Sequence, residues 1–93
     1  MKDEITKILE LILDKLSQRL AEKELKLELT QSAKNYIIDN GYDPIYGARP
    51  LKRYVQHHVE TLIAKTIISG DIDPDSTIIV DTGAGGLTVQ IKK

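Results

Sequence analysis

A group of basic residues near the middle of the chain is the group best suited to chemistry. Arg49, Lys52 and Arg53 fall at the expected start of a helix. A helix N-terminus carries a partial positive charge, so each cation there costs about 0.3–1 kcal/mol, whereas the free backbone amides attract anions. Cationic side chains in this position indicate a phosphate-binding site. The alternative is that they are solvated surface charges, and that the fold tolerates their unfavourable interaction with the helix N-terminus.

Arg49 is the strongest candidate of the three. It precedes Pro50, which disfavours helical geometry and predicts an extended backbone at Arg49. Its side chain is then expected to project from a loop, and a guanidinium is a planar, two-pronged donor that suits phosphate oxygens. Lys52 and Arg53 are about 100° apart on a helix, so the two need not face one ligand.

Hydrophobic spacing predicts the elements that precede these residues. Apolar residues three and four positions apart indicate a helix over about residues 4–23, and leucines alternating with charged residues indicate a strand over 25–29. Thr30 suits the N-cap of a second helix, which should end at Gly41 in the left-handed conformation of a C-cap. The stripe of the first helix is expected to contain Ile5, Ile8, Leu9, Ile12, Leu16 and Leu20, widened by Leu11 and Leu13.

A loop and a third helix carry the basic group itself. The loop is expected over residues 42–49, where tyrosines more often anchor a loop to the core than pack on a nucleotide base. Pro50 suits the first position of a helix that should run to about Ser69, ended by Gly70. Two adjacent histidines point in different directions on a helix and do not chelate together. One face of this helix is expected to hold Leu51, Val55, His58 and Leu62, with His58 in the core or at its rim and with Tyr54, Val59, Ile63 and Thr66 beside this face.

The last part of the chain is predicted to be β structure. Residues 76–81 form a β-branched run with Ile78 and Val80 on one side, and residues 87–91 alternate apolar with polar side chains. A glycine-rich hairpin connection at 82–86 joins them. The order α-β-α-α-β-β predicts an α+β fold with a small three-stranded sheet packed with helices.

Composition limits the classes of function. The 93 residues suffice for a single domain, and 41% hydrophobic with 29% charged residues is typical of a globular protein. Cysteine is absent, and no apolar run approaches the roughly 20 residues of a membrane helix. The net charge of −1 argues against broad nucleic-acid binding. No targeting segment follows Met1, so we expect no membrane partner and a cytoplasmic location.

The segment around the basic group also resembles a known family. Residues 41–53, Gly-Tyr-Asp-Pro-Ile-Tyr-Gly-Ala-Arg-Pro-Leu-Lys-Arg, are similar to the Gly-Tyr-Asp-Pro…Gly-Ala-Arg-Pro-Leu segment of Clp-type AAA+ ATPases. The similarity extends from residues 16–23 through 68–71 and so covers nearly the whole chain. Tyr46, Lys52 and residues 60–65 look most like ClpB, in its second ATPase module. Ile63 departs from the family, which often has Glu-Thr-Pro-Leu there; the missing proline should only straighten the helix.

The resemblance implies a role for each residue of the motif. Residues 1–93 would be one small C-terminal domain cut from a larger chain, in which Arg49 is the sensor-2 residue that reaches the terminal phosphates of ATP. Gly47 and Ala48 would let the backbone approach the nucleotide, with Lys52 a weaker contact. The large AAA+ domain of the same chain would hold ATP and magnesium. Hydrolysis would rotate the small domain against it within a homohexamer that rescues aggregated proteins.

Features that are missing also shape the expectation. The chain has no Gly-x-x-x-x-Gly-Lys-Ser/Thr sequence to cradle phosphates and no paired carboxylates for acid–base catalysis, so by itself it is not expected to hydrolyse ATP. Three alternatives stay open. The parent could be a ClpC- or ClpA-type unfoldase, the chain could be a nucleic-acid-binding module that uses Lys34 with the basic group, or it could serve only for subunit contact.

Overall fold

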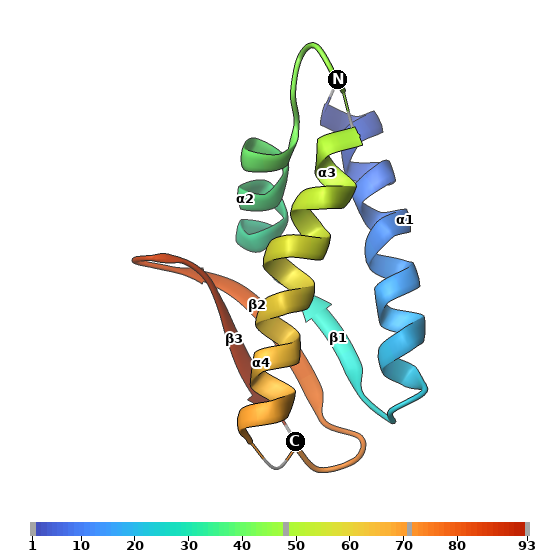
Figure 1. Ribbon diagram of the computed structural model, residues 1–93, viewed down its shortest axis with the longest axis vertical. Helices are drawn as coiled ribbons and strands as arrows, with labels where there is room; N and C mark the ends of the chain where they lie inside the picture. The colour runs from blue at the N-terminus through green and yellow to red at the C-terminus, as the bar shows by residue number, and fades with distance from the viewer. Residues whose placement is uncertain (1, 48, 71, 93) are drawn as a thin grey trace.

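The computed structural model describes residues 2–47, 49–70 and 72–92, without the side chains of Lys2 and Asp3. The predicted order and the α+β class are confirmed. Helices α3, η1 and α4 follow one another without a break and lie in front of the sheet in Figure 1, with α1 alongside. The elements are α1 (Lys2–Ala21), β1 (Lys26–Leu29), α2 (Gln31–Gly41), α3 (Arg49–Tyr54), η1 (Val55–Glu60), α4 (Thr61–Ser69), β2 (Thr77–Gly83) and β3 (Gly86–Lys92).

The sheet has the order β1-β2-β3 and contains both kinds of strand pairing. β1 runs parallel to β2, with Leu27 opposite Ile78, and β2 runs antiparallel to β3. Ile78 and Val80 are fully buried while their neighbours in β2 are half-buried, which confirms the predicted alternation. The hairpin is tighter than expected, because Gly83 pairs with Gly86 and leaves a two-residue turn.

Helix α1 buries a stripe that is rotated from the predicted one. Its buried residues are Ile5, Leu9, Leu13, Leu16 and Leu20. Ile8 is 36% exposed and Leu11 is 66% exposed, so the prediction that both contribute to the buried stripe is wrong. Apolar residues surround much of this helix, and the positions of α2, α3 and β1 decide which of them become core. The consequence is an apolar surface on α1 that faces outward.

The third helical segment buries a face with strict four-residue spacing. Leu51, Val55, Val59 and Ile63 are at most 2% exposed, whereas His58 is exposed and lies outside the core. The buried face therefore passes through Val59 and Ile63, which were expected beside it. Four residues of an α-helix rotate by about 400°, which is about 40° more than a full turn. Residues at this spacing would therefore move around a regular α-helix by about 40° at each step. The wider π turn of η1 turns less per residue and offsets the drift. The segment thus runs unbroken from Arg49 to Ser69 with a π turn in its middle.

Helix α2 begins as predicted and is also tied to the sheet. The hydroxyl of Thr30 accepts a hydrogen bond from the amide of Ala33 at 3.1 Å, which makes it the N-cap. The same hydroxyl donates to Oδ1 of Asp81 at 2.8 Å, and the Thr82 amide donates to that oxygen at 2.7 Å. The Thr82 amide first and then the Thr30 hydroxyl lower the pKa of the Asp81 carboxyl.

The lowered pKa of Asp81 predicts a sensitivity to acid. A carboxyl whose pKa is lowered in the folded state stabilises the fold at pH values above its unfolded pKa of about 3.9. This stabilisation is lost as the pH falls through the lower pKa of the folded state. We expect Asp81→Asn to destabilise the domain in urea at pH 7 and to differ less from wild type at pH 3. Asp39→Asn, at an exposed position on α2, is the control. An equal loss at both pH values would contradict the prediction.

Candidate functional site

The loop before α3 is held in shape by its own backbone and by Asp43. The Asp43 carboxylate accepts hydrogen bonds from the amides of Ile45 at 2.7 Å and Tyr46 at 3.1 Å. Backbone hydrogen bonds also join Asp43 and Gly47 in both directions. Gly47 has a φ of 68°, a left-handed conformation that favours glycine. Figure 1 shows this loop at one end of the molecule, far from the β2–β3 hairpin.

The tyrosines of the loop do not anchor it as predicted. Tyr46 is 67% exposed and Tyr42 is 41% exposed, so neither ring is buried in the core. The loop is instead fastened through Gly41, which is the buried last residue of α2. A Cβ on Gly41 would lie 2.9 Å from Cδ1 and 3.2 Å from Cα of Leu51. Gly41 is therefore needed for close packing of α2 on α3, and the predicted left-handed C-cap is wrong, because the capping residue Tyr42 is extended.

Arg49 is the first residue of α3, and its side chain is exposed. The predicted extended backbone is therefore wrong. The bias before proline is only a preference, and here the helix must begin early enough to bury Leu51, which is 0% exposed. Proline at the second helical position is tolerated because its missing N–H has no partner in the first turn. Among the described residues, no ion pair or hydrogen bond engages the Arg49 guanidinium.

The basic residues line one groove at the start of α3. Arg49, Lys52 and Arg53 lie around a space of about 590 Å³, together with Tyr46, Pro50 and Gln56. The first turn of α3 contains no acidic residue. Gly47, one of the two predicted backbone contacts, is not among the residues that line this groove, and Ala48, the other, lies outside the described residues. The structure thus brings the three cations of the sequence prediction together on one surface, which we call the basic groove.

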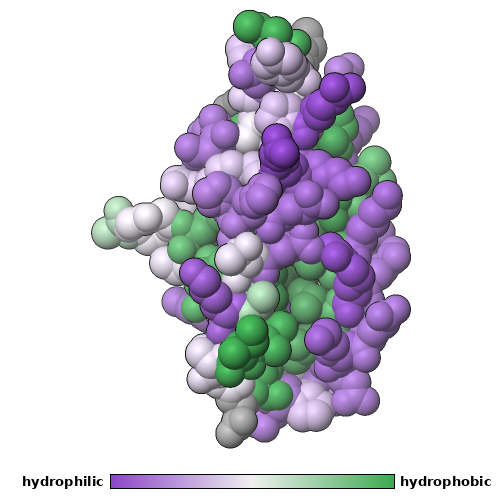
Figure 2. Space-filling view, in the orientation of Figure 1, coloured by the Kyte–Doolittle hydropathy of each residue, from purple (hydrophilic) through white to green (hydrophobic). Residues whose placement is uncertain are grey.

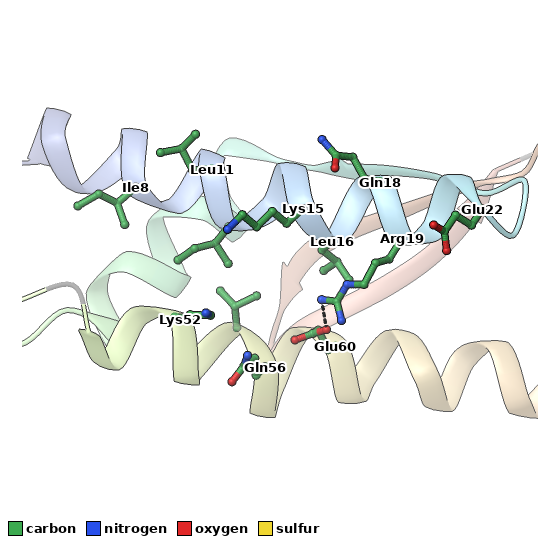
Figure 3. Close-up of a pocket in the computed structure, with 12 residues that line it drawn as sticks. Ile8, Leu11, Lys15, Leu16, Gln18, Arg19, Glu22, Lys52, Gln56 and Glu60 are labelled. Carbon is green, nitrogen blue, oxygen red and sulfur yellow. Dashed lines mark hydrogen bonds and ion pairs between the residues drawn. The ribbon is translucent and has the colours of Figure 1, made fainter.

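A second groove, which sequence reasoning missed, runs between α1 and the third helical segment. It encloses about 630 Å³ and combines apolar residues such as Ile8, Leu11 and Val55 with the cations Lys15 and Lys52. Figure 3 shows Ile8, Leu16 and Arg19 of α1 directed toward the facing helix, whereas Leu11 and Gln18 point away from it. Lys52 and Gln56 line both grooves. The outward Leu11 of α1 was the sequence signal for it. We call this second space the α1 groove.

An ion pair crosses the α1 groove at its middle. Arg19 of α1 bonds Glu60 at the end of η1, as the dashed line in Figure 3 marks. The Arg19 side chain is 62% exposed, so the pair contributes at most about 1 kcal/mol. A separate groove of about 330 Å³ lies along α4; Arg19 and Glu60 line it as well, together with Ile68, which is 85% exposed. Figure 2 shows the corresponding apolar patch at the lower centre of the molecule.

The histidines and carboxylates do not form a metal site in the described part of the chain. Within residues 2–47, 49–70 and 72–92, no three His, Cys, Asp or Glu side chains gather closely enough to hold an ion. His58 instead stacks on Tyr54, with ring centroids 4.2 Å apart. Burial first, and Tyr36 second, raise the pKa of the Tyr54 hydroxyl. None of the helices in these residues is both long and apolar enough to span a bilayer.

Comparison with known proteins gives the family of the chain. The family described as the C-terminal, D2-small domain of ClpB protein matches residues 1–80. The chain is 44% identical over 90 residues to the chaperone protein ClpB of Bacillus cereus, covering 97% of this chain and 10% of that protein. It is 47% identical over 78 residues to ClpB of Aquifex aeolicus (84% and 8%). It is 49% identical over 80 residues to ClpB 2 of Synechocystis sp. (86% and 9%).

The matched segment contains every element that shapes the two grooves. Residues 1–80 include the loop before α3, the basic residues and the whole of the third helical segment. The chain spans about a tenth of the length of the relatives it matches. The family match and the relatives point to the same family, and the α+β order of the structure is the one expected for it. The chain therefore belongs to the family of the C-terminal D2-small domain of ClpB.

Proposed function

We propose that this domain is the nucleotide-sensing small domain of a longer AAA+ chaperone that rescues aggregated proteins. In this proposal Arg49 is the sensor-2 residue, offered to the terminal phosphates of ATP that the large domain of the same chain holds with magnesium. The observation that carries it is the exposed Arg49 guanidinium, which no described carboxylate engages, in a groove lined by two further cations. ATP turnover by the full-length parent with Arg49 substituted tests this role.

The mechanism follows from a difference in attraction between two ligand states. ATP offers its terminal phosphate to Arg49, and hydrolysis removes that phosphate from the nucleotide. The domain then binds the post-hydrolysis state less tightly, so it is free to rotate against the large domain. The folded loop and the buried Leu51 hold the start of α3 to the body of the domain. A movement of Arg49 is therefore passed to the domain as a whole. Without a phosphate-cradling loop, the isolated domain does not hydrolyse ATP in this proposal.

The α1 groove supports a role in assembly beside nucleotide sensing. Leu11, which lines the α1 groove, is 66% exposed, and Ile68, which lines the neighbouring groove along α4, is 85% exposed. Large exposed apolar side chains of this kind mark a contact surface. We propose that a neighbouring subunit of a homohexamer covers it. No nucleic acid or membrane takes part in this function, and a cytoplasmic location stays a prediction from the sequence.

Charge introduced into the α1 groove tests its role in assembly. We expect Leu11→Asp in the full-length parent to shift hexamers toward smaller species in sedimentation with ATP, because the burial of a carboxylate against apolar residues is strongly unfavourable. Lys7→Asp, at an exposed position of α1 outside the groove, should leave the distribution unchanged. Intact hexamers in the Leu11 variant would refute the subunit contact, and intact hexamers with lost ATP-driven activity would point to the large domain of the same chain.

The other readings of the sequence have less support. Relatives named ClpB match over most of the chain, which favours a ClpB parent over a ClpC or ClpA one. A purely structural module would leave Arg49 without a use. Substitution of Arg49 separates the two roles, since nucleotide sensing predicts lower ATP turnover with unchanged oligomer size, and a purely structural role predicts no loss of turnover.

A further inference from the structure

We infer that Arg53 is a second phosphate-binding residue and that, with Arg49, it grips the terminal phosphate of the nucleotide. This inference rests on the proposed function of the basic groove. Arg49 and Arg53 are four residues apart in α3, and positions with this spacing lie on the same face of a helix. Both side chains are exposed, and both line the basic groove.

The two arginines sit together at a cost to the helix. Like charges four residues apart repel and destabilise a helix, and cations near its N-terminus add to this cost. No acidic residue lies in the first turn to offset it. Among residues 2–47, 49–70 and 72–92, neither guanidinium has an ion-pair partner. A ligand with several negative charges bound between the two guanidiniums attracts both of them, and this attraction outweighs their mutual repulsion. The arrangement therefore favours a bound phosphate.

Lys52 is the competitor for this role, and the structure separates it from Arg53. Lys52 also lines the α1 groove, whereas Arg53 does not. Figure 3 shows Lys52 directed between α1 and the facing helix, on the same side as Lys15. Its ammonium is a single point charge, whereas a guanidinium offers a planar fork that matches two phosphate oxygens. Arg53 therefore complements Arg49 better than Lys52 does.

A pair of guanidiniums predicts selectivity for the triphosphate. Each forms charge-assisted hydrogen bonds with phosphate oxygens, and a terminal phosphate gives both of them acceptors at once. A diphosphate lacks that group, so it loses contacts with both arginines. Arg53 would thus determine how strongly the domain distinguishes the state before hydrolysis from the state after it.

Affinity measurements on the full-length parent test this inference. The nucleotide site of the other ATPase module is disabled, and calorimetry gives the Kd values for the slowly hydrolysed analogue ATPγS and for ADP. We expect Arg53→Ala to weaken ATPγS binding about tenfold, since hydrogen bonds to charged groups carry effects of this size, and to weaken ADP binding less than about threefold. Arg53→Lys should recover part of the loss, and Lys52→Ala should weaken ATPγS binding less than Arg53→Ala does. Lys65→Ala, at an exposed position of α4 outside the basic groove, is the control and should change neither Kd by more than about threefold.

The variants separate failure of this inference from failure of the proposed function. A large effect of Arg49→Ala with none of Arg53→Ala overturns the second-arginine role and leaves nucleotide sensing intact. No effect of Arg49→Ala overturns the proposed function itself. A greater ATPγS effect in Lys52→Ala than in Arg53→Ala assigns the second contact to Lys52 and overturns the inference. Equal weakening of ATPγS and ADP, or a lowered Tm in both Arg53 variants, indicates a structural role and overturns it as well.

Discussion

Arg49→Ala in the full-length parent is expected to lower ATP turnover by its second ATPase module about tenfold or more. The reason is the loss of charge-assisted hydrogen bonds to the terminal phosphate, each with an effect of about 1.5–3 kcal/mol. Disaggregation of a heat-aggregated test protein should fall with it. Arg49 is exposed, and no other described side chain bonds to it, so the Tm of the domain should change little.

Two further variants sharpen this prediction. Arg49→Lys keeps the charge but lacks the two-pronged donor, so its turnover should lie between wild type and Arg49→Ala. Lys65→Ala removes an exposed cation of α4 outside the basic groove and should retain wild-type turnover. Wild-type turnover in Arg49→Ala would refute the sensor role, and an equal loss in Lys65→Ala would show that the effect comes from general surface charge.

Leu51→Ala is expected to cause the largest loss of stability, about 2–5 kcal/mol in the free energy of unfolding. Leu51 is 0% exposed and packs directly against Gly41, so its truncation opens a cavity between α2 and α3. A domain of this size has a total stability of about 5–15 kcal/mol, so this loss is a large part of it. Urea denaturation of the wild-type and variant chains measures the change.

A nearby surface residue provides the control for Leu51. Ile45 is an apolar residue of the adjoining loop, but it is 84% exposed. Ile45→Ala should therefore change the free energy of unfolding by no more than about 0.5 kcal/mol. If the two variants lost similar stability, the close packing of α2 on α3 would not be what holds this end of the domain. If Leu51→Ala alone loses stability, the start of α3 is anchored by the core, as the proposed transmission of movement from Arg49 requires.

Much of the fold could be predicted because its signals are local. Alternation in β2 placed Ile78 and Val80 correctly on one side of the strand, which is the buried side, and Thr30 was correctly identified as a helix N-cap. A hydroxyl that caps a helix acts on amides within one turn, so neighbouring residues suffice to predict it. The same holds for Gly70, which is the C-cap residue of α4.

The wrong predictions share one cause, which is that they depended on contacts between distant residues. Gly41 was expected to adopt the left-handed conformation of a C-cap. It is needed instead because Leu51 of another helix comes within 2.9 Å of where a Cβ on Gly41 would lie. His58 was expected on the apolar stripe, in the core or at its rim, but the π turn of η1 places Val59 there instead. The backbone of Arg49 was expected to be extended, but the burial of Leu51 begins the helix at Arg49.

By itself, the sequence determined the order of helices and strands, the segment of the chain in which cations gather, and the family motif that contains Arg49. These are properties of residue type and spacing along the chain, and they do not require a neighbour. Only the tertiary structure decided which side of α1 is buried, which leaves Leu11 at the surface, and that Arg49 and Arg53 line one groove while Lys52 also faces another. Hydrophobic spacing leaves the rotation of an apolar helix undetermined, and that rotation is set by the residues packed against it.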